Sequence, residues 1–154
     1  MKLPLTGGCQ CGAIRYEITQ APRLVYTCHC TDCQRFSGSA FAMSVVVEEN
    51  GFHLRGPELR PVPRVTDSGR RTNRWLCPDC CVTICGGAKP GSAPPDALRG
   101  VRAGTLDDSS WVRPTLHFWT RSAQPWVVLP EGGRRFETQP DDFARLMAGS
   151  GSAV

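Results

Sequence analysis

Three cysteines fall within six positions in the segment CHCTDC at residues 28–33. One residue separates Cys28 from Cys30, so on an extended chain their sulfurs lie on the same side. Two residues separate Cys30 from Cys33, which is the spacing of a zinc knuckle. Three thiolates fill three positions of a tetrahedral zinc, and an open fourth position distinguishes catalytic from structural zinc. The alternative is that Cys81 or Cys85 supplies a fourth ligand and makes this site structural too.

A second set of cysteines has the spacing of a closed metal site. Cys9 and Cys11 lie in CQC, and Cys77 and Cys80 lie in CPDC. Together the two pairs supply four thiolates, which is the ligand set of a structural zinc. Such a site would connect segments separated by nearly half the chain, and its binding free energy would add to the free energy of folding.

Other uses of the nine cysteines are less consistent with the pattern. Disulfides rarely link cysteines only one or two residues apart, and the N-terminus has no hydrophobic export stretch, so metal binding is favoured over a disulfide framework. A thioredoxin-like role for CPDC needs a helix at its first cysteine, but the following CVTICGG is β-branched and glycine-rich. A redox role for Cys80 and Cys81 remains a further alternative.

Short strand-like runs must position these cysteines, because helical periodicity is scarce and glycine and proline are frequent. Strands are predicted at residues 13–18, 41–47, 115–120 and 125–129, with a hairpin over 64–77 whose turn contains Asp67, Ser68 and Gly69. Short helices are predicted at 94–100 and 138–149 from their proline, aspartate and glycine signals. The sequence therefore predicts a mainly β protein with its metal ligands at strand ends and turns.

Length and charge limit the remaining classes. The 154 residues suit a single domain, expected over residues 1–148 with a frayed tail at 149–154. The net charge of +4 comes from scattered arginines, so no nucleic-acid partner is expected. No apolar run approaches the roughly 20 residues of a membrane span, so we expect no membrane partner and a cytoplasmic location. The sequence leaves a homo-oligomer open.

The cysteine blocks also carry a family resemblance. The segments GGCQCGAIRYEI, CHCTDCQRFSGSAFA, LCPDC, VRAGTLDD and HFWTRSAQPW follow one another over about residues 7–127. Their order and spacing resemble the glutathione-dependent formaldehyde-activating family, which includes centromere protein V-like proteins. The resemblance implies a zinc-stapled β-tent fold of twisted antiparallel strands with one or two short helices.

The resemblance also implies the site and its chemistry. It implies two zinc ions per chain, a structural one on Cys9, Cys11, Cys77 and Cys80 and a catalytic one on Cys28, Cys30 and Cys33. The implied activity is that of a carbon–sulfur lyase, which joins formaldehyde and glutathione to S-hydroxymethylglutathione or handles a related thiol–aldehyde adduct.

Accessory residues each have two interpretations. Arg35, two residues after Cys33, is the nearest candidate to bind the anionic thiol, although a surface arginine near a turn is an equally good interpretation. His29 is a candidate proton carrier, and a hydrogen-bonded strand histidine is the favoured alternative for it and for His117.

One position departs from the family pattern. Cys81 stands where relatives usually have glycine, and a left-handed turn there would cost a cysteine roughly 1 kcal/mol. Cys81 could also compete with Cys80 as a ligand, whereas Cys85 is most simply a small buried side chain. The functional alternative to an enzyme is a non-catalytic zinc-scaffold interaction module.

Overall fold

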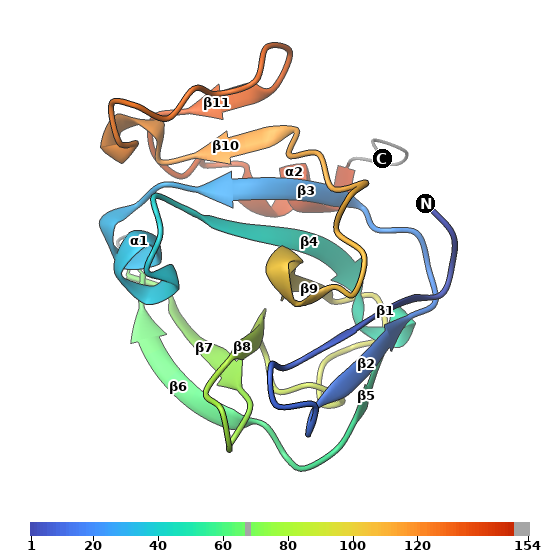
Figure 1. Ribbon diagram of the computed structural model, residues 1–154. Coiled ribbons are helices and arrows are strands. Elements are labelled where there is room, and N and C mark those ends of the chain that lie inside the picture. Colours follow the sequence, from blue (N-terminus) through green and yellow to red (C-terminus); the bar gives the residue numbers. More distant parts are fainter. Residues whose placement is uncertain (67–68, 150–154) are drawn as a thin grey trace.

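A computed structural model describes residues 1–66 and 69–149. Two sheets make up the protein (Figure 1). The larger sheet has the order β11–β10–β3–β4–β9–β8–β7–β6, formed by β3 (Leu24–Cys28), β4 (Ala42–Glu48), β6 (Arg60–Val65), β7 (Arg71–Leu76), β8 (Thr83–Gly87), β9 (Leu98–Arg102), β10 (Leu116–Phe118) and β11 (Arg134–Phe136). The smaller sheet has the order β1–β2–β5, formed by β1 (Leu5–Gly8), β2 (Arg15–Ile18) and β5 (Phe52–Arg55).

Helices are few and short. They are α1 (Thr31–Ser37) and α2 (Phe143–Gly149), with single 3₁₀ turns η1 (Glu49–Gly51), η2 (Ala103–Thr105) and η3 (Thr120–Ser122). The predicted fold class, mainly β with one or two short helices, is confirmed. No helix in the described part of the chain is long and apolar enough to cross a membrane.

The middle of the large sheet is buried on both faces. Strand β4 sends Val45 and Val47 into the main core, which the small sheet covers, and Val46 into a second cluster on the opposite face. Met147 of α2 belongs to that second cluster, so the C-terminal helix covers part of this face. This two-sided burial explains the unbroken valine run of β4, because alternation is needed only where one face meets water.

Long-range pairing confirms some sequence predictions and overturns others. Strands β6 and β7 form the predicted hairpin, although Asp67 and Ser68 of its turn lie outside the described residues. Strand β10 pairs parallel to both β3 and β11, so the large sheet is not wholly antiparallel.

Two predicted elements are wrong. Residues 125–129 form a turn and an irregular segment in place of a strand, and Trp126 and Val128 are exposed there. Residues 94–100 form a turn that leads into β9 in place of a helix, because the 98–102 segment pairs with β4. The helix predicted at 138–149 begins only at Phe143, and the predicted tail beyond Gly149 lies outside the described residues.

A buried ion pair fixes the segment between β8 and β9. Arg99 donates from Nε to the Glu49 carboxylate at 2.7 Å, and these residues are 2% and 8% exposed. Arg99 also donates to the Ala88 carbonyl, and Glu49 accepts from the Gly91 backbone. Since each charged group has several partners, this segment is held firmly against the sheet.

Candidate metal centres and active-site cavity

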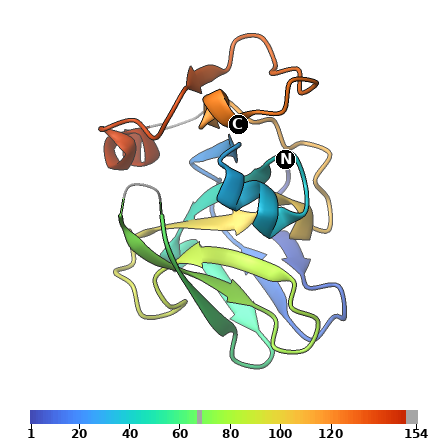
Figure 2. The ribbon, with the colours of Figure 1, turned by 90° about the vertical axis from the view of Figure 1, so that its left-hand side faces the viewer.

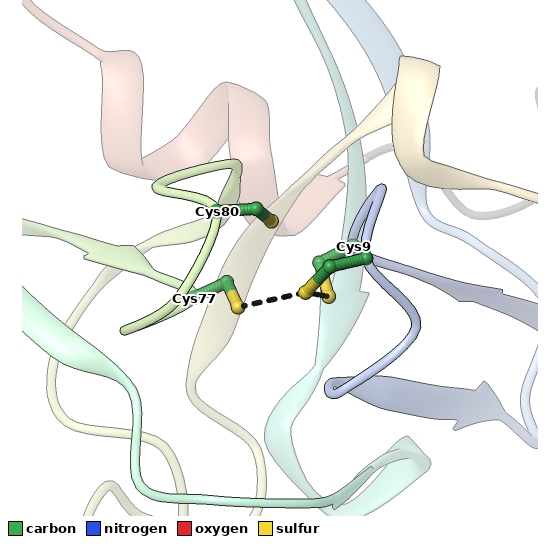
Figure 3. Close-up of side chains that lie close together, drawn as sticks. Cys9, Cys77 and Cys80 are labelled. Atoms are coloured by element: carbon green, nitrogen blue, oxygen red, sulfur yellow. Dashed lines mark hydrogen bonds between the residues drawn. The ribbon is translucent and has the colours of Figure 1, made fainter.

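Four cysteine sulfurs converge between the two sheets. Cys9 and Cys11 lie in the turn after β1, while Cys77 and Cys80 lie in the loop from β7 to β8 (Figure 3). Their sulfurs all lie within 4.8 Å of one another, with 3.4 Å between Cys9 and Cys11 and 3.7 Å between Cys11 and Cys77. The Ile14 backbone N–H donates to the Cys9 sulfur. The two loops therefore present one four-sulfur cluster.

Three further sulfurs converge where β3 leads into α1. Cys28 ends β3, Cys30 is the N-cap of α1, and Cys33 lies in the first turn of that helix. The sulfurs of Cys28 and Cys30 are 3.6 Å apart, and the Cys30 sulfur accepts from the Cys33 backbone N–H at 3.3 Å. A left-handed Gly38 ends the helix, as is usual at a helix C-terminus. The helix was not predicted from the sequence, and it, not an extended strand, positions Cys33.

Both clusters have the donor chemistry and spacing of a zinc site. Zinc–sulfur bonds of about 2.3 Å in a tetrahedron place the sulfurs about 3.8 Å apart. The observed separations of 3.4–3.7 Å are close to that edge length. The cluster of four thiols can therefore hold a metal ion on its own, whereas the cluster of three leaves one position of a tetrahedral ion for another ligand.

Charge is unevenly distributed over the three-cysteine cluster. Hydrogen bonds from Cys28 and Cys30 hold the pKa of the Cys33 thiol well below its usual value, and Arg102 and Arg64 lower it further. Hydrogen bonding to Cys30 and Cys33, together with burial, raises the pKa of Cys28. The pKa shifts thus favour the thiolate at Cys33 over that at Cys28, mainly because Cys33 accepts hydrogen bonds from the neighbouring cysteines.

A cavity of about 670 Å³ opens on the three-cysteine cluster. Its floor is one face of the large sheet, where Tyr26, Ser44 and Arg102 lie side by side on β3, β4 and β9. Arg64 and Arg74 of the β6–β7 hairpin also line it. The cavity therefore combines all three sulfurs with several guanidinium groups.

Two of these arginines share one carboxylate. Arg64 and Arg74 both contact the same oxygen of Asp32, at 2.7 and 2.8 Å. Arg64 also points Nη1 at the Cys33 sulfur from 4.0 Å. The Nε atoms of both arginines are buried and have no protein partner in the described part of the chain. A single carboxylate thus orients two cations beside the cluster without neutralising both.

Arg102 keeps much of its hydrogen-bonding capacity unused inside the cavity. It donates from Nη1 to Ser44 Oγ at 3.0 Å, and its guanidinium lies 5.0 Å from the centre of the Phe36 ring. Its Nε is buried and unpartnered, and no salt bridge to it is present among residues 1–66 and 69–149. Nη2 has no hydrogen-bond partner among the described residues and is not buried, so it is available to an anion such as a carboxylate.

The accessory residues named from the sequence lie elsewhere. Arg35 is exposed on α1 and is not among the residues that line the cavity. Cys81 is exposed with a φ of 60°, the left-handed conformation that favours glycine, and Arg60 donates to its sulfur at 3.2 Å. Cys85 is fully buried in the core, 3.5 Å from Arg99 Nη1. Neither Cys81 nor Cys85 belongs to a metal-binding cluster among the described residues.

The two histidines form a buried network behind the cluster. Thr27 Oγ1 lies 3.0 Å from His29 Nε2 and 2.8 Å from His117 Nδ1, linking β3 to β10. Burial lowers the pKa of both imidazoles, and neither lines the cavity. Both histidines thus have the hydrogen-bonded structural environment that the sequence analysis favoured for them.

The sequence reasoning missed Arg64, Arg74 and Arg102, the cavity-lining arginines whose charges act on Cys33. They come from β6, β7 and β9, and no motif marks them among the scattered arginines. Strand β7 offers no alternating signal, because residues 71–74 all line the cavity and Trp75 enters the main core.

Comparison with known proteins agrees with this arrangement. A family model described as glutathione-dependent formaldehyde-activating enzyme matches residues 4–122, which include all seven clustered cysteines. A crystal structure of a Rhodobacter sphaeroides protein, a Northeast Structural Genomics target, is similar in fold, with 18% identity, a TM-score of 0.50 and coverage of 85% of this chain and 98% of that one. A search of curated proteins gave no match. Because the family match spans well over half the sequence, the chain belongs to the glutathione-dependent formaldehyde-activating enzyme family.

Proposed function

We propose that the chain is a zinc-dependent enzyme that joins an anionic thiol to a small aldehyde, with glutathione and formaldehyde giving S-hydroxymethylglutathione as the reference reaction. In the reverse direction it is a carbon–sulfur lyase. The observation that carries the proposal is the three-cysteine cluster, which opens on a cavity lined by arginines. Membership of the family supports glutathione and formaldehyde as the first pair to test.

The two cysteine clusters have different roles in this proposal. Cys9, Cys11, Cys77 and Cys80 would bind a structural zinc that fastens the N-terminal turn to the β7–β8 loop. Cys28, Cys30 and Cys33 would bind the catalytic zinc. Bound there, zinc would supply a Lewis-acid centre with a free coordination position, which lowers the pKa of an incoming thiol.

The reaction forms one bond and moves one proton. The thiol sulfur adds to the aldehyde carbon, the carbon–oxygen double bond becomes a single bond, and the proton lost by the thiol ends on that oxygen. The cluster positions the two reactants, and holding them together contributes to the rate by removing the entropy of their encounter.

The arginines that line the cavity support an anionic substrate. Arg64, Arg74 and Arg102 carry three positive charges, against one on the Asp32 carboxylate and the single net negative charge of zinc bound by three thiolates. The cavity therefore stays positive with the metal in place and favours a thiol that carries carboxylates. We propose that Arg102, with its free Nη2, binds a substrate carboxylate, the role that sequence spacing suggested for Arg35.

The oxidation state of the cysteines is consistent with a reducing compartment. All nine cysteines are free thiols in the structure, although several lie close together. We therefore propose a cytoplasmic location, where such thiols remain reduced and available to metal.

The test uses zinc-replete protein with glutathione and formaldehyde, following the hydroxymethyl signal by NMR and zinc content by elemental analysis. We expect two zinc ions per chain and adduct formation above the uncatalysed rate. Cys33→Ser should abolish the enzymatic rate, while the matched control Cys81→Ser, at an exposed cysteine outside both clusters, should retain it. A protein with two zinc ions and no activity toward any thiol–aldehyde pair would instead support the zinc-scaffold interaction module.

A further inference from the structure

The cavity has a second half that is apolar. Besides the arginines, its lining includes Tyr26, Leu98, Phe118, Phe143 and Met147. The last two belong to α2, which lies outside the family-matched residues 4–122. Part of the cavity wall is therefore contributed by a segment beyond the family-matched range.

The apolar half is a packed surface built on Phe118. The Phe118 ring lies 5.4 Å from the Tyr26 ring and 5.3 Å from the Phe143 ring, measured between centroids, both edge to face. Met147 is only 8% exposed within the same cluster. Edge-to-face pairs of this kind hold aromatic side chains in defined positions. The wall is thus fixed by its own contacts.

The helix α2 also meets the opposite side of the cavity. Figure 2 shows α2 next to the outer ends of β6 and β7. The Arg70 guanidinium lies 5.6 Å from the centre of the Phe143 ring, a cation–π distance. The C-terminal helix therefore contacts the β6–β7 hairpin beside the cavity.

The two halves meet at the cysteine cluster. Cys28 packs against the apolar cluster of Phe118 and Met147, whereas Cys33 faces Arg64. Trp119 packs against both this apolar cluster and the three cysteines. A molecule bound at the cluster is thus in contact with cations on one side and with apolar side chains on the other.

The cavity is larger than formaldehyde requires, and formaldehyde has no apolar group to fill its apolar half. A volume of about 670 Å³ lies in the range that accommodates a drug-sized ligand, and formaldehyde has one carbon and one oxygen. Glutathione uses the cationic half through its carboxylates, and its polar tripeptide has no long apolar group for the other half. The apolar half is left for the group that becomes attached to the thiol sulfur.

We propose that the preferred aldehyde carries an apolar substituent, which packs on Phe118, Phe143 and Met147 while the thiol's carboxylates face the arginines. This inference rests on the proposed function and names its substrate class. The reaction has the same balance as with formaldehyde. The thiol sulfur bonds to the carbonyl carbon, the thiol proton passes to the carbonyl oxygen, and the product is a thiohemiacetal with a secondary hydroxyl group.

The first experiment compares formaldehyde, propanal and pentanal with glutathione, measuring kcat/KM for each. Propanal and pentanal have carbonyls of similar reactivity, so burial of each added methylene should raise kcat/KM about fourfold between them until the wall is covered. Met147→Gln, of similar size and good helix propensity, should remove the advantage of pentanal over propanal. Arg145→Gln is the matched control because Arg145 is exposed on the same helix. Equal kcat/KM for propanal and pentanal, or an equal loss for all three aldehydes in Met147→Gln, would overturn the inference.

A binding experiment separates this inference from the proposed function. S-hexylglutathione and S-methylglutathione resemble the two kinds of adduct and do not react. Calorimetry on the zinc-loaded chain should show the hexyl compound binding at least tenfold more tightly, with that advantage lost in Met147→Gln and retained in Arg145→Gln. Turnover of no aldehyde together with this binding pattern would reject the proposed reaction and retain the apolar subsite, while equal affinities would reject the subsite.

Discussion

Replacement of Arg102 by methionine tests whether the cavity recognises a carboxylate. Methionine keeps an unbranched apolar stem of similar reach, so contact with the Phe36 ring is largely preserved. The substitution removes the guanidinium and its bond to Ser44 Oγ. Ser44 lies opposite Arg102 on the neighbouring strand β4 and is left with only a hydroxyl to satisfy. The fold should therefore tolerate the change.

The expected magnitude follows from the free Nη2 of Arg102. A hydrogen bond to a charged group is worth about 1.5–3 kcal/mol, and the half-buried position of Arg102 favours the lower part of that range. A loss of about 1.5–2 kcal/mol corresponds to about a 10- to 30-fold fall in kcat/KM for glutathione. Arg64 and Arg74 remain in place, so binding should weaken without disappearing.

The assay measures initial rates of adduct formation against glutathione concentration and repeats them with glutathione diethyl ester, which has no free carboxylate. In the unmodified protein the ester should be the poorer substrate, whereas Arg102→Met should treat the two thiols more nearly alike. Arg35→Met, at an exposed position outside the cavity, should behave as the unmodified protein. Zinc content should stay at two per chain. An equal loss for glutathione and its ester, or the same loss in Arg35→Met, would refute carboxylate binding by Arg102.

Three other changes test the site and the fold. Cys33→Ser should lower the zinc content to about one ion per chain with a small change in melting temperature. Cys77→Ser should instead lose the structural ion and much of the stability. An equal fall in melting temperature in both variants would contradict the division into catalytic and structural sites. Glu49→Gln should reduce the free energy of unfolding by about 3–5 kcal/mol because Arg99 is left buried and uncompensated, and a urea midpoint unchanged from the parent would show that the pair contributes little. Burial lowers the folded-state pKa of His117 below 6.5, so between that pKa and pH 6.5 the unfolded state binds more protons than the folded state. The free energy of unfolding is therefore highest above pH 6.5 and falls as the pH drops through 6.5 toward the folded-state pKa. In His117→Gln the slope of unfolding free energy against pH in that window should be smaller by up to about 1.4 kcal/mol per unit, and parallel curves would exclude His117 as the source.

Local spacing was sufficient to predict which cysteines form groups that could bind metal. A one-residue gap directs two sulfurs to one side, and a two-residue gap in a turn directs them to one centre, so Cys9 with Cys11 and Cys77 with Cys80 are paired by short-range geometry. The structure then brings the two pairs together in one cluster. Strand runs were recognised in the same way, because a buried β segment such as β4 has a local apolar signature.

Errors occurred where tertiary contacts override local preference. The 94–100 segment has proline and glycine at helix-like positions, but pairing with β4 extends its second half into β9. The run at 125–129 has strand-forming residues but no partner strand among the described residues, and it leaves Trp126 and Val128 in solvent. Strand propensity reflects cross-strand packing, so it has little effect where no neighbour is present.

The sequence by itself determined which cysteines group together as candidate metal ligands, the mainly β class and the family. Only the tertiary structure decided what surrounds the three-cysteine cluster. Arg64, Arg74 and Arg102 meet there because β6, β7 and β9 lie in one sheet, with these side chains on the face that also bears Cys28. Phe143 and Met147 reach it from the far end of the chain through α2. The physical reason is that ligand spacing is a property of a few neighbouring residues, whereas the cavity depends on sheet order and register, which are set by contacts between residues distant in sequence.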